Sequence, residues 1–318
     1  MVNIVTSYVN PDTDGVASAL AIAAYPSSFH LHGKWDAVFS GVLNPETKHF
    51  LSIRNIEASV SNLVPENINS LTLVDTHERN GLPKWISSDF HVQLIIDHHM
   101  SASSNTVSAD RLINEEVGAA ATIVAEFLIQ TGVSISADIA YVLQMAILSN
   151  TSLFSTSSTT QRDRDVLTQL GIFSNLDNGT AFFMAKQGRE KLLATPLDKL
   201  ILGDVKRFSF GPHNYVVSQV EGTNISDRIH SLSLKTLVHK LAPVEKSSTV
   251  VINLVDIPNG CSYIYIDDTS FRHLFYEYAR IAASSLPEMK GDWVVLPYVA
   301  IRKTHIIPWL SKIANNAI

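Results

Sequence analysis

The sequence is poor in cysteine, with only Cys261 among its 318 residues. A single thiol excludes an internal disulfide, and it excludes zinc-finger and iron–sulfur frameworks, because these need several thiolates. It also fits a reducing compartment. We therefore expect a cytoplasmic protein.

Charge and long apolar runs are scarce as well. Charged residues make up 17% of the chain, against about 25% in typical domains. The net charge of −6 argues against a nucleic-acid-binding surface that acts through bulk positive charge. The longest uncharged apolar stretch starts at Ile139 and ends at Leu148, well short of the roughly 20 residues of a membrane span. The first residues lack a secretory pattern. We expect a soluble protein that binds neither nucleic acid nor membrane.

Hydrophobic residues, at 46%, are abundant enough for a large core, and the length predicts about two domains. In the first part of the chain, short apolar runs alternate with segments of helical periodicity. The runs predict strands at 2–5, 71–74 and 92–96, and the periodic segments predict helices at 15–24, 118–131 and 137–148. This alternation is typical of an α/β domain with a mainly parallel sheet.

The pattern changes near residue 190. Strand-like segments at 215–220, 249–255, 262–266 and 293–296 are then separated by Gly, Pro and Asn, with helical segments at 231–241 and 271–284. We predict a second, smaller α+β domain. The expected division is a first domain at 1–188, a linker at 189–196 and a second domain at 197–318.

Acidic residues and histidines follow three of the predicted strands. They are Asp12 and Asp14, then Asp75, then His98 and His99. Ligands of open α/β sheets bind beyond the carboxyl ends of the strands, so these side chains can converge. Carboxylate and imidazole suit Mn²⁺, Co²⁺ or Mg²⁺, and a pair of ions can clamp a phosphoryl group.

Each of these segments has an ordinary interpretation when it stands alone. Asn-Pro-Asp-Thr-Asp at 10–14 is often a turn with an Asx cap, and Asp-His-His at 97–99 can be a polar strand end. Their joint occurrence, each at the end of a predicted strand, favours a metal site.

These motifs resemble the DHH phosphoesterase superfamily and, within it, the manganese-dependent (family II) inorganic pyrophosphatases. The similarity extends in order over nearly the whole chain. It is carried by 10–14 with 17–19, Val74-Asp75, Asp97-His98-His99, Val117-Gly118 with 121–123, Leu153-Phe154, Asp204-Val205-Lys206, and Arg302-Lys303 with Pro308. The run at 10–14 and the late Arg-Lys pair point to the pyrophosphatase branch.

The resemblance implies a DHH-type first domain that binds metal and a second domain that binds substrate. Asp12, Asp14, Asp75 and His98 would hold Mn²⁺ or Co²⁺, with Asp75 bridging. The residues implied to bind phosphoryl oxygens and to act in catalysis are His99, Lys206, Arg302 and Lys303. Taken alone, either lysine would be a solvated surface residue. The resemblance also implies Mg²⁺ with the substrate, and a homodimer formed through the first domain.

Two positions depart from the family pattern. Tyr8 stands where the relatives have a histidine ligand, and Asn150 stands where they have an aspartate ligand. A phenol with a pKa of about 10 is a poor ligand, and an amide brings no charge. We expect weaker binding of at least one ion. By residue count, the site of Asp14, Asp75 and His98 keeps more ligands than that of Asp12 and Tyr8.

The second motif differs too, since relatives often have Asp-His-Asn-Glu where this chain has Asp75-Thr76-His77-Glu78. His77 could replace a nearby polar contact, but we expect a solvent-facing loop histidine.

Three functions are compatible with these residues. The first is a pyrophosphatase, splitting pyrophosphate into two phosphates, with an altered metal site. The second is an exopolyphosphatase or another DHH phosphoesterase, and the third is a weak or inactive phosphate-binding relative. We favour the first. Activated water would attack phosphorus directly, since the sequence has no nucleophile elbow, and closure of the second domain would bring in Arg302 and Lys303.

Overall fold

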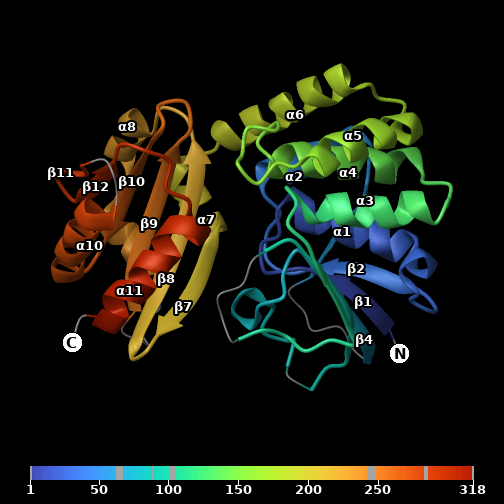
Figure 1. Ribbon diagram of the computed structural model, residues 1–318, viewed down its shortest axis with the longest axis horizontal. Helices are drawn as coiled ribbons and strands as arrows, with labels where there is room; N and C mark the ends of the chain where they lie inside the picture. The colour runs from blue at the N-terminus through green and yellow to red at the C-terminus, as the bar shows by residue number, and fades with distance from the viewer. Residues whose placement is uncertain are drawn as a thin grey trace. The chain divides into compact units, whose positions relative to one another are not determined.

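A computed structural model describes residues 2–61, 67–87, 89–99, 105–242, 248–282 and 286–316. The chain splits into two compact units, Met1–Ala194 and Thr195–Ile318 (Figure 1). The first has a parallel sheet and the second a mixed sheet, each with its own helices. This confirms the predicted class, an α/β unit with a mainly parallel sheet and a second, smaller α+β unit. No helix among the described residues is long and apolar enough to cross a membrane.

The sheet of the first unit has six strands in the order β3-β2-β1-β4-β5-β6. All its neighbouring strands pair in parallel. The strands are β1 (Val2–Thr6), β2 (Trp35–Phe39), β3 (Ser59–Val60), β4 (Ile68–Val74), β5 (Val92–Asp97) and β6 (Arg111–Asn114). The chain builds outward from β1 to β3 and then returns to place β4 on the other side of β1. In open α/β sheets, ligands bind at such a reversal, which here lies at the carboxyl ends of β1 and β4.

The described residues of the first unit form six α-helices, and Figure 1 shows α1, α3 and α4 along one side of its sheet. They are α1 (Thr13–Ala24), α2 (Pro45–Ile53), α3 (Ala120–Gln130), α4 (Ala137–Asn150), α5 (Gln161–Ser174) and α6 (Asn178–Leu193). The core between helices and sheet includes Val5, Phe39 and Tyr141. On the other face, Leu71 and Ile95 pack against a segment with Trp85 and Phe90, which includes the short turn η2 (Arg79–Gly81). Another short turn, η1 (Pro26–Phe29), follows α1.

Helix α6 continues to Leu193, so the first residues of the predicted linker at 189–196 are helical. Gly188 lies in this helix, and a Cβ there would come within 2.2 Å of the Phe50 ring. Glycine at this position allows α6 to pack closely on α2.

The second unit is built on a sheet in the order β11-β12-β10-β9-β8-β7, with β8 and β9 as its parallel pair. Its strands are β7 (Val205–Phe210), β8 (His213–Gly222), β9 (Ser248–Asp256), β10 (Cys261–Ile266), β11 (Glu288–Lys290) and β12 (Trp293–Leu296). Its helical segments are α7 (Leu197–Gly203), α8 (Ile225–Arg228), η3 (Ile229–Ser231), α9 (Leu234–Leu241), α10 (Thr269–Ala282), η4 (Arg302–Ile306) and α11 (Ile307–Asn316). Tyr215, Ile264 and Phe275 are in its core. The predicted helix end at 283–284 lies outside the described residues.

Candidate metal centre

The predicted ligands of the first unit follow β1, β4 and β5, three adjacent strands of the parallel sheet. Asp12 and Asp14 begin α1 directly after the β1 loop. Asp75 follows β4, and the histidine pair follows β5. The topology therefore brings these side chains to one edge of the sheet.

Asp12 caps helix α1. Its Oδ1 accepts the backbone N–H groups of Asp14 at 2.9 Å and Gly15 at 3.2 Å. A Cβ on Gly15 would lie 2.5 Å from Ser7 Oγ, so glycine lets the helix start close to the strand end. The Tyr8 hydroxyl accepts the backbone N–H of Asp12 at 3.3 Å. The phenol therefore lies beside Asp12, at the position where a ligand was expected.

Asp14 is buried, and its carboxylate caps the N-terminus of a second helix, α3, which lies more than 100 residues later in the chain. Its Oδ2 and Oδ1 accept the backbone N–H groups of Ala120 and Ala121 at 2.8 and 2.7 Å. The Ser18 hydroxyl adds a 3.4 Å contact to Oδ1. Burial, and then the negative charge of Asp75, raises the pKa of Asp14 well above its ordinary value.

Asn150, the last residue of α4, turns its amide nitrogen toward the same carboxylate. The side-chain N–H group donates to Asp14 Oδ2 at 3.2 Å and to the Gly118 carbonyl at 2.9 Å. The same nitrogen lies 3.3 Å from His98 Nε2. Asp14 thus faces four donors, which match the roughly four lone-pair sites of a carboxylate.

Asp75 lies in the left-handed backbone region, with a φ of 57°, a conformation that aspartate tolerates better than most residues. Its backbone N–H donates to the Ile96 carbonyl at 2.8 Å, which fixes the turn against β5. Burial, and then the charge of Asp12, raises the pKa of Asp75 to about 7, against the opposing effect of His98.

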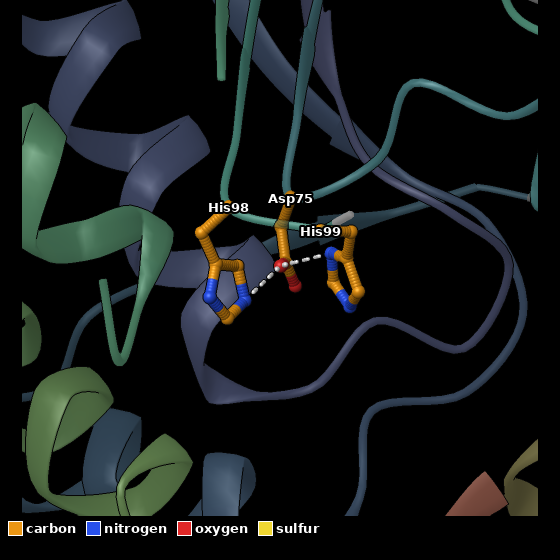
Figure 2. A group of neighbouring side chains, drawn as sticks. All are labelled: Asp75, His98 and His99. Carbon is orange, nitrogen blue, oxygen red and sulfur yellow. Dashed lines mark ion pairs between the residues drawn. The ribbon is translucent and has the colours of Figure 1, made fainter. Parts of the chain in front are cut away.

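The Oδ1 atom of Asp75 is buried and has no hydrogen-bond partner in the part of the chain that the structure describes. It lies 3.3 Å from His98 Nε2 and 3.6 Å from His99 Nδ1, as the dashed lines of Figure 2 show. A buried carboxylate oxygen without a donor is costly. It is therefore a fitting place for a cation.

His98 is oriented by the backbone of the loop before α3. Its Nδ1–H donates to the Val117 carbonyl at 2.9 Å, which directs Nε2 toward Asp75 and, at 3.8 Å, Asp14. This is how metal-binding histidines are commonly held. Burial lowers the pKa of His98, but the nearby carboxylate of Asp75, followed by that of Asp14, outweighs this effect and raises the pKa to about 9.

Asp163 was not recognised from the sequence, yet it supports this loop. Its buried carboxylate accepts the Gly118 N–H at 3.0 and 3.1 Å and the Thr122 hydroxyl at 2.6 Å. It also closes a capping box with Thr160 at the start of α5. The spacing Thr160-x-x-Asp163 is the signal that could have revealed the helix cap, although not its contact with Gly118.

His77 corrects the expectation of a solvent-facing loop residue. Its side chain is 4% exposed, and its Nδ1 makes a short contact with Asp97 Oδ2. The loop after β4 folds back so that the His77 carbonyl accepts the Val107 N–H. This carries the ring into the interior beside the end of β5.

Asp75, His98 and His99 offer nitrogen and oxygen atoms that lie within 4.8 Å of one another, and Figure 2 shows them on adjacent loops. His99 Nδ1 is occupied by Asp97 Oδ1 at 2.7 Å. The atoms best placed for an ion are therefore Asp75 Oδ1 and His98 Nε2. Carboxylate with imidazole suits Mn²⁺ and related divalent ions, so the residues fit such an ion. Which atoms bind it stays a prediction.

The basic residues predicted from the sequence all belong to the second unit. Lys206 is half-buried on β7, and Lys303 is exposed on η4. Arg302 is largely buried at the start of η4, where its Nη1 pairs with Asp204 Oδ1 at 2.9 Å. Its backbone N–H donates to Gln219. The guanidinium of Arg302 thus already binds one anionic oxygen, that of the Asp204 carboxylate.

The fold and the acidic edge define the class of protein. A family model described as "DHH family, N-terminal domain" matches residues 3–147. The "Probable manganese-dependent inorganic pyrophosphatase" of Bacillus licheniformis is 30% identical over 312 residues, covering 97% of each chain. The "Manganese-dependent inorganic pyrophosphatase" of Bacillus subtilis is 25% identical over 311 residues, again with 97% of each chain.

A solved structure supports the same fold. It is that of a Methanococcus jannaschii protein assigned to the family II inorganic pyrophosphatases, with a TM-score of 0.77, 24% identity, and coverage of 99% of this chain and 100% of that one. The chain therefore belongs to the DHH family, in its branch of manganese-dependent inorganic pyrophosphatases. The resemblance drawn from the motifs is confirmed.

Proposed function

We propose that this protein hydrolyses inorganic pyrophosphate to two phosphates with a divalent ion, Mn²⁺ or Co²⁺, at the edge of the first sheet. The observation that carries the proposal is the buried Asp75 Oδ1, which accepts no hydrogen bond within the described part of the chain and lies 3.3 Å from His98 Nε2. It occurs in a chain that aligns over nearly its full length with proteins named manganese-dependent inorganic pyrophosphatases.

Asp75 and His98 would hold the ion, with Asp12 beside them. The bound ion would lower the pKa of water and neutralise the departing phosphate. The chain itself orients these groups: the Val117 carbonyl sets the His98 ring, and the left-handed turn sets Asp75. His99, 31% exposed, would contact a phosphoryl oxygen.

We further propose that the metal site is altered and holds one ion tightly rather than two. The Asn150 side chain donates an N–H to Asp14, and its nitrogen lies 3.3 Å from His98 Nε2. Beside Asp12, the phenol of Tyr8 stands where the relatives have an imidazole ligand. A neutral N–H donor at Asp14 competes with a cation for the same oxygen atoms. A count of two tightly bound Mn²⁺ per purified chain would contradict this.

The second unit would supply the positive charge that pyrophosphate needs. Lys206, Arg302 and Lys303 are the proposed contacts to phosphoryl oxygens, with Mg²⁺ accompanying the substrate. The Arg302 pair with Asp204 Oδ1, made through Nη1 at 2.9 Å, supports this role, because it shows the guanidinium binding an anionic oxygen. We also propose a cytoplasmic homodimer, which analytical ultracentrifugation would test.

The test is phosphate release from pyrophosphate, tripolyphosphate and long-chain polyphosphate with Mn²⁺, Co²⁺ or Mg²⁺. We expect release from pyrophosphate with Mn²⁺ or Co²⁺. Stepwise release from the longer chains in preference would instead indicate an exopolyphosphatase. Phosphate binding without turnover of any substrate would indicate an inactive relative.

Arg302→Gln sharpens the test, with the surface variant Arg280→Gln as its matched control. Within the described residues, the ion pair of Arg280 is a local one with Glu277. We expect a raised KM for pyrophosphate in Arg302→Gln and an unchanged KM in Arg280→Gln. Equal KM values in both variants would remove Arg302 from the proposed substrate contacts.

A further inference from the structure

Two side-chain amides lie together in the sheet of the second unit. Asn253 is fully buried in β9, a strand made mostly of valine, isoleucine and leucine. Gln219, which is half-buried, is its partner in the parallel ladder between β8 and β9 (Figure 1). Neighbouring strands lie about 4.8 Å apart, so the two side chains meet, and Asn253 Nδ2 donates to Gln219 Oε1 at 3.0 Å. The two amides therefore form one polar pair within an apolar layer.

This amide pair holds the main chain of the segment that ends at Arg302. The Nδ2 group of Asn253 donates to the Ala300 carbonyl at 2.7 Å, and Gln219 Oε1 accepts the backbone N–H of Arg302. The pair thus takes up one acceptor and one donor of the main chain, two residues apart. The Ser262 hydroxyl oxygen also accepts the Ala300 N–H at 2.8 Å. The main chain is therefore fixed at Ala300 and Arg302, where η4 begins.

Asn253 is not the side chain that packing alone would favour. Its Oδ1 is buried and has no hydrogen-bond partner in the described part of the chain. A buried amide oxygen without a donor is unfavourable, and a leucine of similar size would suit a strand of this composition. Proteins break such rules of stability mainly at functional sites. The useful part of Asn253 is therefore its donor group, which reaches Gln219 and Ala300.

Arg302 is held at both of its ends. Its backbone N–H donates to Gln219, and its guanidinium donates through Nη1 to Asp204 Oδ1 at 2.9 Å. The same Nη1 lies 3.5 Å from the carbonyls of Asp204 and Val217. Among the described contacts the guanidinium uses Nη1 alone, so Nε and Nη2 keep their N–H donors. Two such donors can grip two oxygens of one phosphoryl group. Where they lie depends on where the main chain of Arg302 is held.

We infer that Asn253 and Gln219 are positioning residues: by fixing the main chain from Ala300 to Arg302, they present the Arg302 guanidinium to a phosphoryl oxygen of the substrate. This role rests on the proposed function, which supplies the phosphoryl contact. Without the Asn253 donor, the Gln219 amide loses the partner that orients it, and the Ala300 carbonyl loses a hydrogen bond. The segment then takes up more than one position, and Arg302 binds the substrate less well.

The first experiment measures hydrogen exchange of the Arg302 backbone amide by NMR, in the full chain labelled with ¹⁵N-arginine and with Arg302→Gln for assignment. Gln219→Met keeps the length of the side chain but offers only a weak acceptor. We expect exchange roughly tenfold faster in Gln219→Met, on the scale of one hydrogen bond, and faster than parental in Asn253→Leu. A parental rate in either variant would overturn the inference. Exchange does not depend on turnover, so its outcome is separate from that of the proposed function.

The second experiment measures KM and kcat for pyrophosphate in Asn253→Leu, in Arg302→Gln and in the double variant. We expect Asn253→Leu to raise KM roughly tenfold, since misplacing a binding group by about 1 Å can cost up to about 100-fold. The kcat should change less than about threefold, as for a group that acts in binding. In the Arg302→Gln background the same substitution should change KM less than about twofold, because the group that it positions is gone. Equal factors in both backgrounds would show a general loss of stability and overturn the inference.

The matched control is Asp267→Ala. The Asp267 carboxylate accepts the Val250 N–H at 2.8 Å near the other end of β9, so its loss weakens the same strand without touching the Arg302 segment. We expect a lower unfolding temperature, with parental KM and parental exchange at the Arg302 amide. A raised KM in this control would mean that any weakening of β9 has the same effect, and would overturn the inference.

Circular dichroism and thermal unfolding check that each variant is folded. Gln219→Met, at a half-buried position, supplies the same KM test if Asn253→Leu does not fold. A KM that rises in Arg302→Gln but in neither folded amide variant would overturn the positioning role alone. A KM that rises in none of them would remove Arg302 from the substrate contacts, and the proposed contact and the positioning role would fall together.

Discussion

Two halves of the same sheet edge differ in how their polar atoms are matched. In the Asp75 half, a buried carboxylate oxygen has no hydrogen-bond donor among the described residues and faces His98 Nε2. In the Asn150 half, the carboxylate of Asp14 is met by backbone and side-chain N–H groups from α3 and α4. The Asp75 oxygen can be satisfied by a bound cation. The Asp14 carboxylate is already satisfied by neutral N–H donors.

The difference shows how one substitution can change a metal site without disturbing its fold. An aspartate at position 150 would place a further negative charge beside Asp14 and Asp75, which only a cation could offset at that depth. The amide of Asn150 instead satisfies Asp14 and Gly118 internally. The sheet edge therefore keeps its geometry, while the negative charge that a cation would have to neutralise is smaller.

The largest effect is expected at Asp75. Asp75→Asn removes the charge of the unpartnered oxygen, so Mn²⁺ affinity should fall by more than the roughly 100-fold that loss of an outer-shell partner costs. Isothermal titration calorimetry with Mn²⁺ measures it, and Asp110→Asn, a change at an exposed aspartate of the same unit, is the control. Unchanged affinity would show that the ion does not bind in the Asp75 half.

Asn150→Asp tests the other half directly. The new carboxylate should raise affinity for a second Mn²⁺ by roughly 10–100-fold, on the scale of other single-group changes at metal sites. The metal-free variant should unfold at a lower temperature than the parent, because like charges are then crowded in a buried site. Asn150→Ala removes the amide without adding charge. A second ion bound equally well by the Ala variant would refute the charge argument.

Asp163→Ala tests how far the supporting loop contributes. Gly118, Thr122 and Thr160 would lose their buried acceptor, so the free energy of unfolding should fall by about 2–4 kcal/mol, with Mn²⁺ affinity down roughly tenfold because the loop that orients His98 loosens. Urea unfolding and calorimetry measure the two effects. Asp165→Ala, on the exposed face of the same helix and bonded only to Gln161 in the described contacts, should change neither.

The smallest effect is expected at Tyr8. Tyr8→His offers an imidazole beside Asp12, but Asp12 Oδ1 remains committed to the helix cap. Mn²⁺ affinity should rise less than tenfold alone and more when combined with Asn150→Asp. Tyr8→Phe, which removes only the hydroxyl, is the control. If the double variant binds metal no better than the parent, these two positions are not ligand positions.

Much of this edge could be predicted from the sequence. The short apolar runs before Asp75 and Asp97 are buried strands, and alternation with helices is enough to indicate a parallel sheet whose carboxyl ends share an edge. Several elements were missed because they are short, mixed in polarity or broken by glycine. They are strands β2, β3, β6, β7 and β11 and helices α2, α5, α6, α7, α8 and α11. The interior position of His77 was mispredicted, since a loop residue carries no local signal for the direction in which its loop folds.

What the sequence determined by itself is the family, the α/β and α+β classes of the two units, and the two departures at Tyr8 and Asn150. The tertiary structure decided what those residues do. Asn150 meets Asp14 across 136 positions of the chain, Asp163 meets Gly118 across 45, and His77 meets Asp97 across 20. Such contacts depend on which helices and loops pack together over the sheet, and no local pattern of residues encodes the distance between two side chains that only packing brings together.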